Sequence, residues 1–74
     1  MQNFFAKPTP KMIADYIYNQ VIHVHETGGK TYRYPVSQSL SISFVNDVID
    51  RLCEYIHDAD IIQLLNGYIV IDWS

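Results

Sequence analysis

Histidine and cysteine are the side chains of this chain best suited to bind a metal ion. His23 and His25 stand two positions apart, and Cys53 and His57 stand four apart. On a β-strand, His23 and His25 would share a face and could hold a metal together with Cys53 or His57. On a helix, the two side chains diverge by about 200°. None of these pairs has a recognised zinc spacing, so the sequence predicts no metal site and no cofactor.

Catalytic groups are equally hard to assemble from this sequence. Cys53 and His57 would be neighbours on a helix, but a cysteine nucleophile also needs donors for an oxyanion, and no such element is visible. Asp58, Asp60 and Asp72 lack the ligand series of a calcium loop, and we expect them to cap and solvate the ends of strands. We therefore expect that this protein is not an enzyme.

Length and composition indicate one small domain. The chain has 74 residues, of which 49% are hydrophobic, and its single cysteine permits no internal disulfide. A domain of this size buries only roughly 60% of the surface of its unfolded chain, so its stability is marginal without a partner. We expect an N-terminal arm over residues 1–8, which carries Phe4 and Phe5, and a domain over residues 9–74. The lone thiol suits an intracellular, reducing compartment.

The charge pattern argues against two classes of partner. The net charge is −3, and most of the basic residues lie in the first half of the chain. This distribution provides no basic surface of the kind that a phosphate backbone requires. No apolar run approaches the ~18–20 residues of a membrane span, and the first residues do not resemble a secretory signal, so we expect no membrane contact.

A helix is predicted from Pro10 onward. Thr9 is a good N-cap, proline suits the first helical position, and Gly28-Gly29 ends the segment. Apolar residues recur at helical spacing, namely Ile13, Tyr16, Ile17, Val21 and Val24. Residues 21–25 are also rich in β-branched side chains, so whether they are helix or strand stays open.

The predicted first helix carries a second apolar stripe, formed by Ala14, Tyr18 and Ile22. A helix that is apolar nearly all round is buried on both sides. Either the N-terminal arm covers the second stripe, or another protein subunit does.

Two further elements follow. Residues 30–36 predict a short strand, which Pro35 places at a sheet edge because proline cannot donate to the ladder. A second helix is predicted from a Ser43 cap through residues 44–57. Its apolar stripe contains Val45, Val48, Ile49, Leu52 and Ile56, and Asp47 and Arg51 form an ion pair on its exposed side.

The last fifteen residues predict a β-hairpin. Asn66-Gly67 lies between two apolar runs, and this pair is typical of a two-residue turn. The turn pairs Leu65 with Tyr68. The pairing then continues along both strands to the last pair, Ile61 with Asp72. One side of the hairpin then carries Ile62, Leu64, Ile69, Ile71 and Trp73, and we expect it to face the core.

The other side of the hairpin carries Ile61, Gln63, Leu65, Tyr68, Val70 and Asp72. This side is too apolar for a fully solvent-exposed surface and too polar for a fully buried core. It is typical of a surface that contacts another protein. The candidate interface residues are therefore Ile61, Leu65, Tyr68 and Val70 of the hairpin, with Tyr18 and Ile22 of the first helix.

Together these elements predict an α+β domain of two layers. The order is helix, strand, helix, strand, strand, with a sheet of about three strands and both helices on one face.

The segment FVNDVIDRLCEYIHDADI, followed by the IVIDWS end, resembles a small module in uncharacterised proteins of nucleocytoplasmic large DNA viruses. The similarity covers residues 44–74. It implies an amphipathic helix packed on a terminal strand, and a viral protein located in the host cytoplasm or the virion. It implies no catalytic residue.

The leading hypothesis is a non-enzymatic protein-interaction or assembly module that associates with itself as a homodimer. One alternative is a nucleic-acid binder of winged-helix type that uses Lys30, Arg33 and the hairpin tip. A second alternative is a small acidic inhibitor of a host enzyme.

Overall fold

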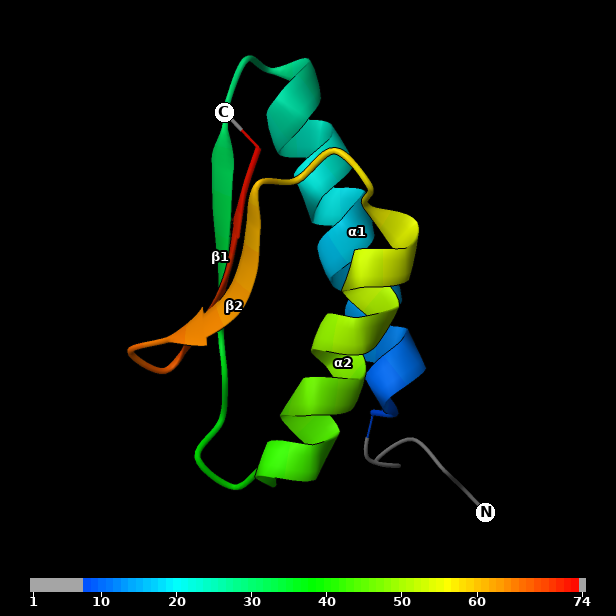
Figure 1. Cartoon of the computed structure of the whole chain (residues 1–74), viewed down its shortest axis with the longest axis vertical. Coiled ribbons are helices and arrows are strands. Elements are labelled where there is room, and N and C mark those ends of the chain that lie inside the picture. The colour runs from blue at the N-terminus through cyan, green and yellow to red at the C-terminus, as the bar shows by residue number, and fades with distance from the viewer. Residues whose placement is uncertain (1–7, 74) are drawn as a thin grey trace.

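The helices and strands follow one another along the chain in the predicted order. The computed structural model describes residues 8–73. Its elements are α1 (Pro10–Glu26), β1 (Thr31–Pro35), α2 (Ile42–Tyr55), β2 (Ile61–Leu65) and β3 (Tyr68–Asp72). The strands form one antiparallel sheet in the order β1-β3-β2, and both helices lie on the same face of it (Figure 1). The predicted two-layer α+β class is confirmed. Phe4 and Phe5 lie outside the described residues.

The start of α1 is the one that the sequence predicts. The Thr9 hydroxyl accepts a hydrogen bond from the backbone N–H of Met12 at 3.2 Å, and Pro10 occupies the first turn. The helix continues without a break to Glu26, so residues 21–25 are helical and not extended. Gly28 ends this segment with φ at +91°, a left-handed conformation that glycine adopts without steric cost.

The bounds predicted for α2 are wrong by two residues at each end. The cap is Ser41, whose hydroxyl accepts from the backbone N–H of Phe44 at 3.2 Å, and not Ser43. Both serines precede the apolar stripe and both can cap, so the turn that leads into the helix decides between them. The helix ends at Tyr55, and His57 therefore lies beyond it.

The hairpin has the predicted register in full. Leu65 faces Tyr68, and the pairing continues to Ile61 with Asp72. Asn66 and Gly67 both have positive φ, at 54° and 82°, as a type I′ turn requires. β1 lies at a sheet edge, as Pro35 predicts. It pairs with β3 along the edge of that strand opposite to β2.

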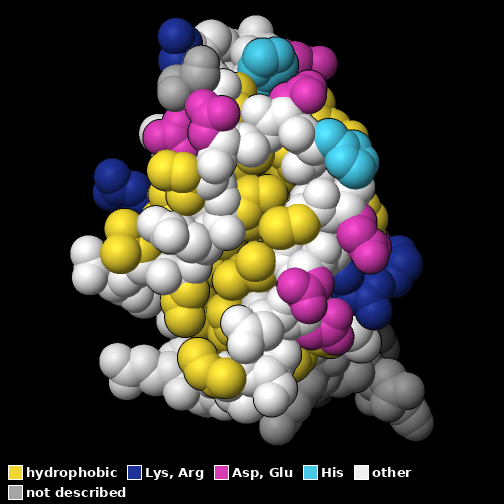
Figure 2. Space-filling view, in the orientation of Figure 1, with side chains coloured by type: hydrophobic (Ala, Val, Ile, Leu, Met, Phe, Trp, Pro, Cys, Tyr) yellow, Lys and Arg dark blue, Asp and Glu magenta, His cyan; other side chains and the backbone are white. Residues whose placement is uncertain are grey.

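The core lies between the sheet and the two helices. Its fully buried side chains include Ile17 of α1, Leu52 of α2, and Ile69 and Ile71 of β3. Hydrophobic side chains remain visible between β2 and α2 (Figure 2). Leu64 belongs to this helix-side face but is 37% exposed, because the tip of the hairpin projects away from the helices (Figure 1). The side predicted for Leu64 is therefore right, while its burial is incomplete.

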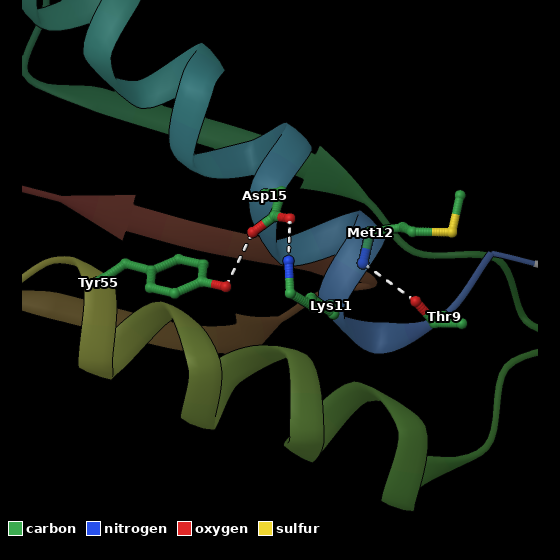
Figure 3. Close-up of polar contacts among 5 residues, drawn as sticks. All are labelled: Thr9, Lys11, Met12, Asp15 and Tyr55. Carbon is green, nitrogen blue, oxygen red and sulfur yellow. Dashed lines mark hydrogen bonds and ion pairs between the residues drawn. The ribbon is translucent and has the colours of Figure 1, made fainter.

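A polar contact joins the two helices at their exposed seam. The Tyr55 hydroxyl donates to Asp15 Oδ1 at 2.8 Å, and Lys11 Nζ donates to Asp15 Oδ2 at 2.9 Å (Figure 3). The Lys11 hydrogen bond, followed by that of Tyr55, holds the pKa of Asp15 below its ordinary value of 3.8. The hydrogen bond to Asp15 raises the pKa of Tyr55 above 10.0.

Replacing Tyr55 by phenylalanine is expected to lower the melting temperature at neutral pH. A tyrosine whose pKa is raised by folding contributes stability that is complete below its unfolded pKa and is lost as pH rises through its folded pKa. The difference in melting temperature between wild type and Tyr55→Phe should therefore close as pH rises above 10.0. Melting curves from pH 6 upward check this, and a difference that stays constant across the series would contradict it.

Candidate interaction surface

The face of the sheet that points away from the helices is bare in the part of the chain that the structure describes (Figure 1). The strand registers place three rows of residues across this face. The rows are Thr31–Asp72–Ile61, Arg33–Val70–Gln63 and Pro35–Tyr68–Leu65.

Apolar side chains gather on one half of this bare face, over β2 and β3. We call Ile61, Leu65, Tyr68 and Val70 the outer patch. Ile61, Leu65 and Tyr68 are 42%, 48% and 42% exposed, and Val70 is half-buried. The structure thus brings together the four hairpin residues that the sequence predicts as an interface.

Polar side chains flank Val70, a member of the outer patch, on both neighbouring strands. Arg33 of β1 faces Val70, and Gln63 of β2 faces Val70 from the other side. The middle row of the face is therefore mixed, and the row of Pro35, Tyr68 and Leu65 at the hairpin tip is wholly apolar. Mixed apolar and polar side chains of this kind are the usual composition of a protein contact.

The two candidate residues of α1 lie elsewhere. α2 packs beside α1 (Figure 1), and the second stripe of α1 runs toward it, so that Ala14 is fully buried. The Tyr18 ring lies 5.5 Å from the Tyr55 ring, measured between centroids, and only Ile22, at 38% exposed, remains open. The sequence-based alternatives for the cover of this stripe are the N-terminal arm and another subunit. They do not include α2, which provides part of that cover.

A pocket of about 360 Å³ opens where the two helices end. Tyr18 and Ile22 line it together with Tyr55, Ile56 and Trp73. At its rim, Trp73 Nε1 donates to His25 Nδ1 at 3.0 Å, which places the proton of a neutral His25 on Nε2. Sequence reasoning missed this pocket, because the two residues of that hydrogen bond are 48 positions apart and no local pattern links them.

The groups considered for metal binding and catalysis do not converge. His23 and His25 lie on a helix, so their side chains diverge. Cys53 is exposed on α2, and His57 lies beyond the end of that helix. Within residues 8–73, no three His, Cys, Asp or Glu side chains gather as a metal site would require.

Asp60 and Asp72 meet at the open end of the hairpin through a backbone hydrogen bond of 2.7 Å, from the Asp60 N–H to the Asp72 carbonyl. This contact ties the loop after α2 to the end of β3. That the carboxylates of Asp58, Asp60 and Asp72 cap and solvate the ends of strands stays a prediction.

Comparisons with protein-family models, with curated proteins and with solved structures find no match to this chain. Neither of the helices in the described residues is long and apolar enough to cross a membrane.

Proposed function

We propose that this chain is a non-enzymatic interaction module that binds protein through the outer patch, and that its simplest partner is a second copy of itself. The observation that carries the proposal is the bare sheet face, where Ile61, Leu65 and Tyr68 are each at least 42% exposed. Each buried Å² of apolar surface contributes about 25 cal/mol. A domain of 74 residues has little other surplus stability.

Charge favours protein over nucleic acid as the partner. The exposed side of α2, the helix that would enter a DNA groove in a winged-helix protein, carries Asp47, Asp50 and Glu54. These carboxylates repel phosphates. Arg33 and Lys30 are exposed on and beside β1, but two cations make a small footprint for a nucleic acid.

The resemblance of residues 44–74 to a module of large DNA viruses supports a viral origin, and with it a site of action in the host cytoplasm or the virion. The single thiol of Cys53 is compatible with such a reducing compartment.

Substitution of Tyr68 by aspartate tests the proposal. Tyr68 lies on the central strand, at the hairpin-tip end of the bare face, between Pro35 and Leu65. A buried, unpaired carboxylate would oppose any contact there, so Tyr68→Asp should sediment as a single chain where wild type forms a larger species. Sedimentation velocity over a concentration series measures this.

Asn46→Asp is the matched control, because it adds the same charge on the exposed side of α2. It should associate as wild type does. A wild type that stays a single chain at all concentrations, together with an unchanged melting temperature in Tyr68→Asp, would overturn the self-association proposal.

A further inference from the structure

The strand β2 forms one edge of the sheet, and its outward backbone groups can be identified. The Val36 N–H donates to the Gly67 carbonyl at 2.9 Å, and the Trp73 N–H donates to the Lys30 carbonyl at 3.0 Å. Odd-numbered positions along β3 therefore bond toward β1. Because backbone groups alternate in an antiparallel ladder, the even-numbered positions bond toward β2.

The even-numbered residues of β3 face Ile61, Gln63 and Leu65, so these three turn their backbone groups inward. The N–H and C=O groups of Ile62 and Leu64 consequently point away from β3, toward the edge. Within residues 8–73 no strand pairs with them there.

The two edges of the sheet differ in their protection. At the β1 edge, Pro35 removes a backbone donor. Arg33, together with Lys30 just before the strand, adds positive charge. These are the features by which natural sheets block edge-to-edge pairing. β2 has the sequence IIQLL, with no charge, no proline and no glycine. It is therefore open to the addition of another strand.

β2 is also complementary to itself. When two copies pair antiparallel about Gln63, Ile62 faces Leu64 of the second copy, and Ile61 faces Leu65 of the second copy. Ile62 and Leu64 are then in hydrogen-bonded positions. The outward N–H and C=O groups of both residues each pair with a backbone group of the second copy. Every facing pair other than the central one is apolar, and no like charges meet.

We infer that β2 pairs with β2 of a second copy, in antiparallel register centred on Gln63, to form a continuous sheet of twice the width. This inference rests on the self-association part of the proposed function and places that contact at the β2 edge. The partly exposed Leu64 would pack against Ile62 of the second copy, on the helix side. On the other side, Ile61 and Leu65 would join the two outer patches into one surface.

Proline at position 64 tests the backbone contact. The Leu64 N–H points to the edge, so Leu64→Pro removes no bond to β3, and proline is tolerated at such edge positions. It deletes two of the four hydrogen bonds between copies, one for each chain. Leu64→Thr is the control, because it loses the same apolar side chain but keeps the N–H. We expect Leu64→Pro to associate at least roughly tenfold more weakly than Leu64→Thr in sedimentation velocity.

Charge at position 63 tests the register, independently of any effect of proline on folding. Gln63 is exposed and would face itself in a non-hydrogen-bonded pair, with Cα atoms about 4.5 Å apart. Gln63→Lys and Gln63→Glu should each sediment as single chains, and an equimolar mixture should form the heterodimer. A mixture that associates no better than its components would overturn the inference.

The outcomes separate this inference from the proposed function. Association that survives Leu64→Pro and both Gln63 variants but is lost in Tyr68→Asp would refute the edge pairing and leave the outer patch as the contact. Association that is lost in the edge variants but survives in Tyr68→Asp would support the edge and refute the outer patch. A wild type that never associates would refute the edge pairing and the self-association part of the proposed function.

Discussion

Replacing Ile71 by aspartate is expected to unfold the protein. Ile71 is 0% exposed and lies on the central strand, on the face that the helices cover. A carboxylate there would lose its water without gaining a partner, at a cost of several kcal/mol. A domain of 74 residues has roughly 4–11 kcal/mol of total stability. Circular dichroism and the fluorescence of Trp73, the only tryptophan, should report the loss of structure.

The neighbouring substitution Val70→Asp should leave the fold intact. Val70 points to the opposite face, and there an aspartate would lie across from Arg33, which provides an opposite-charge pair between strands. We expect Val70→Asp to melt cooperatively and to associate less than wild type. If both variants unfolded, or if both folded, the assignment of faces along β3 would be wrong.

Replacing Leu52 by alanine is expected to have the second-largest effect. Leu52 is 0% exposed and packs in the core from α2. Such truncations lower the free energy of unfolding by about 2–5 kcal/mol, because the apolar transfer energy is lost and a cavity remains. Urea denaturation should therefore show a much lower midpoint and a similar slope.

Cys53→Ala provides the matched control for Leu52→Ala. Cys53 is the next residue on the same helix, and its side chain is exposed. We expect its free energy of unfolding to remain within about 0.5 kcal/mol of wild type. Equal effects of the two substitutions would contradict the position of α2 over the core.

The features that the sequence predicts well are those with local causes. Asn66-Gly67 selects one turn type, and that turn fixes the register of five residue pairs. Thr9 and Pro10 determine the start of α1 for a similar reason. The faces of the hairpin follow from alternation alone once the register is known.

The features that the sequence does not predict depend on how the elements pack. Ser41 and Ser43 are equally good caps in isolation, and the entering turn selects Ser41. The partial burial of the second stripe of α1 depends on α2, which begins more than fifteen residues after α1 ends. The pocket between the helix ends and Trp73 likewise exists only once three distant segments meet.

The fold buries one set of apolar residues in the core and leaves others exposed, namely Met12, Tyr16 and Ile42 of the helices as well as the outer patch of the sheet. Ile17, Leu52 and Ile71 are buried in the core, whereas the outer patch has no protein over it within the described residues. This contrast is why we propose a binding role for the sheet and not for the exposed side of α2.

Backbone amide NMR spectra of the wild type at increasing protein concentration test that claim most directly. We expect the shifts that change with concentration to fall on β2 and β3, with little change at Asn46, Asp50 and Glu54 of α2. Spectra that do not change up to millimolar concentration, or changes confined to the exposed side of α2, would contradict the sheet as the surface through which two copies meet.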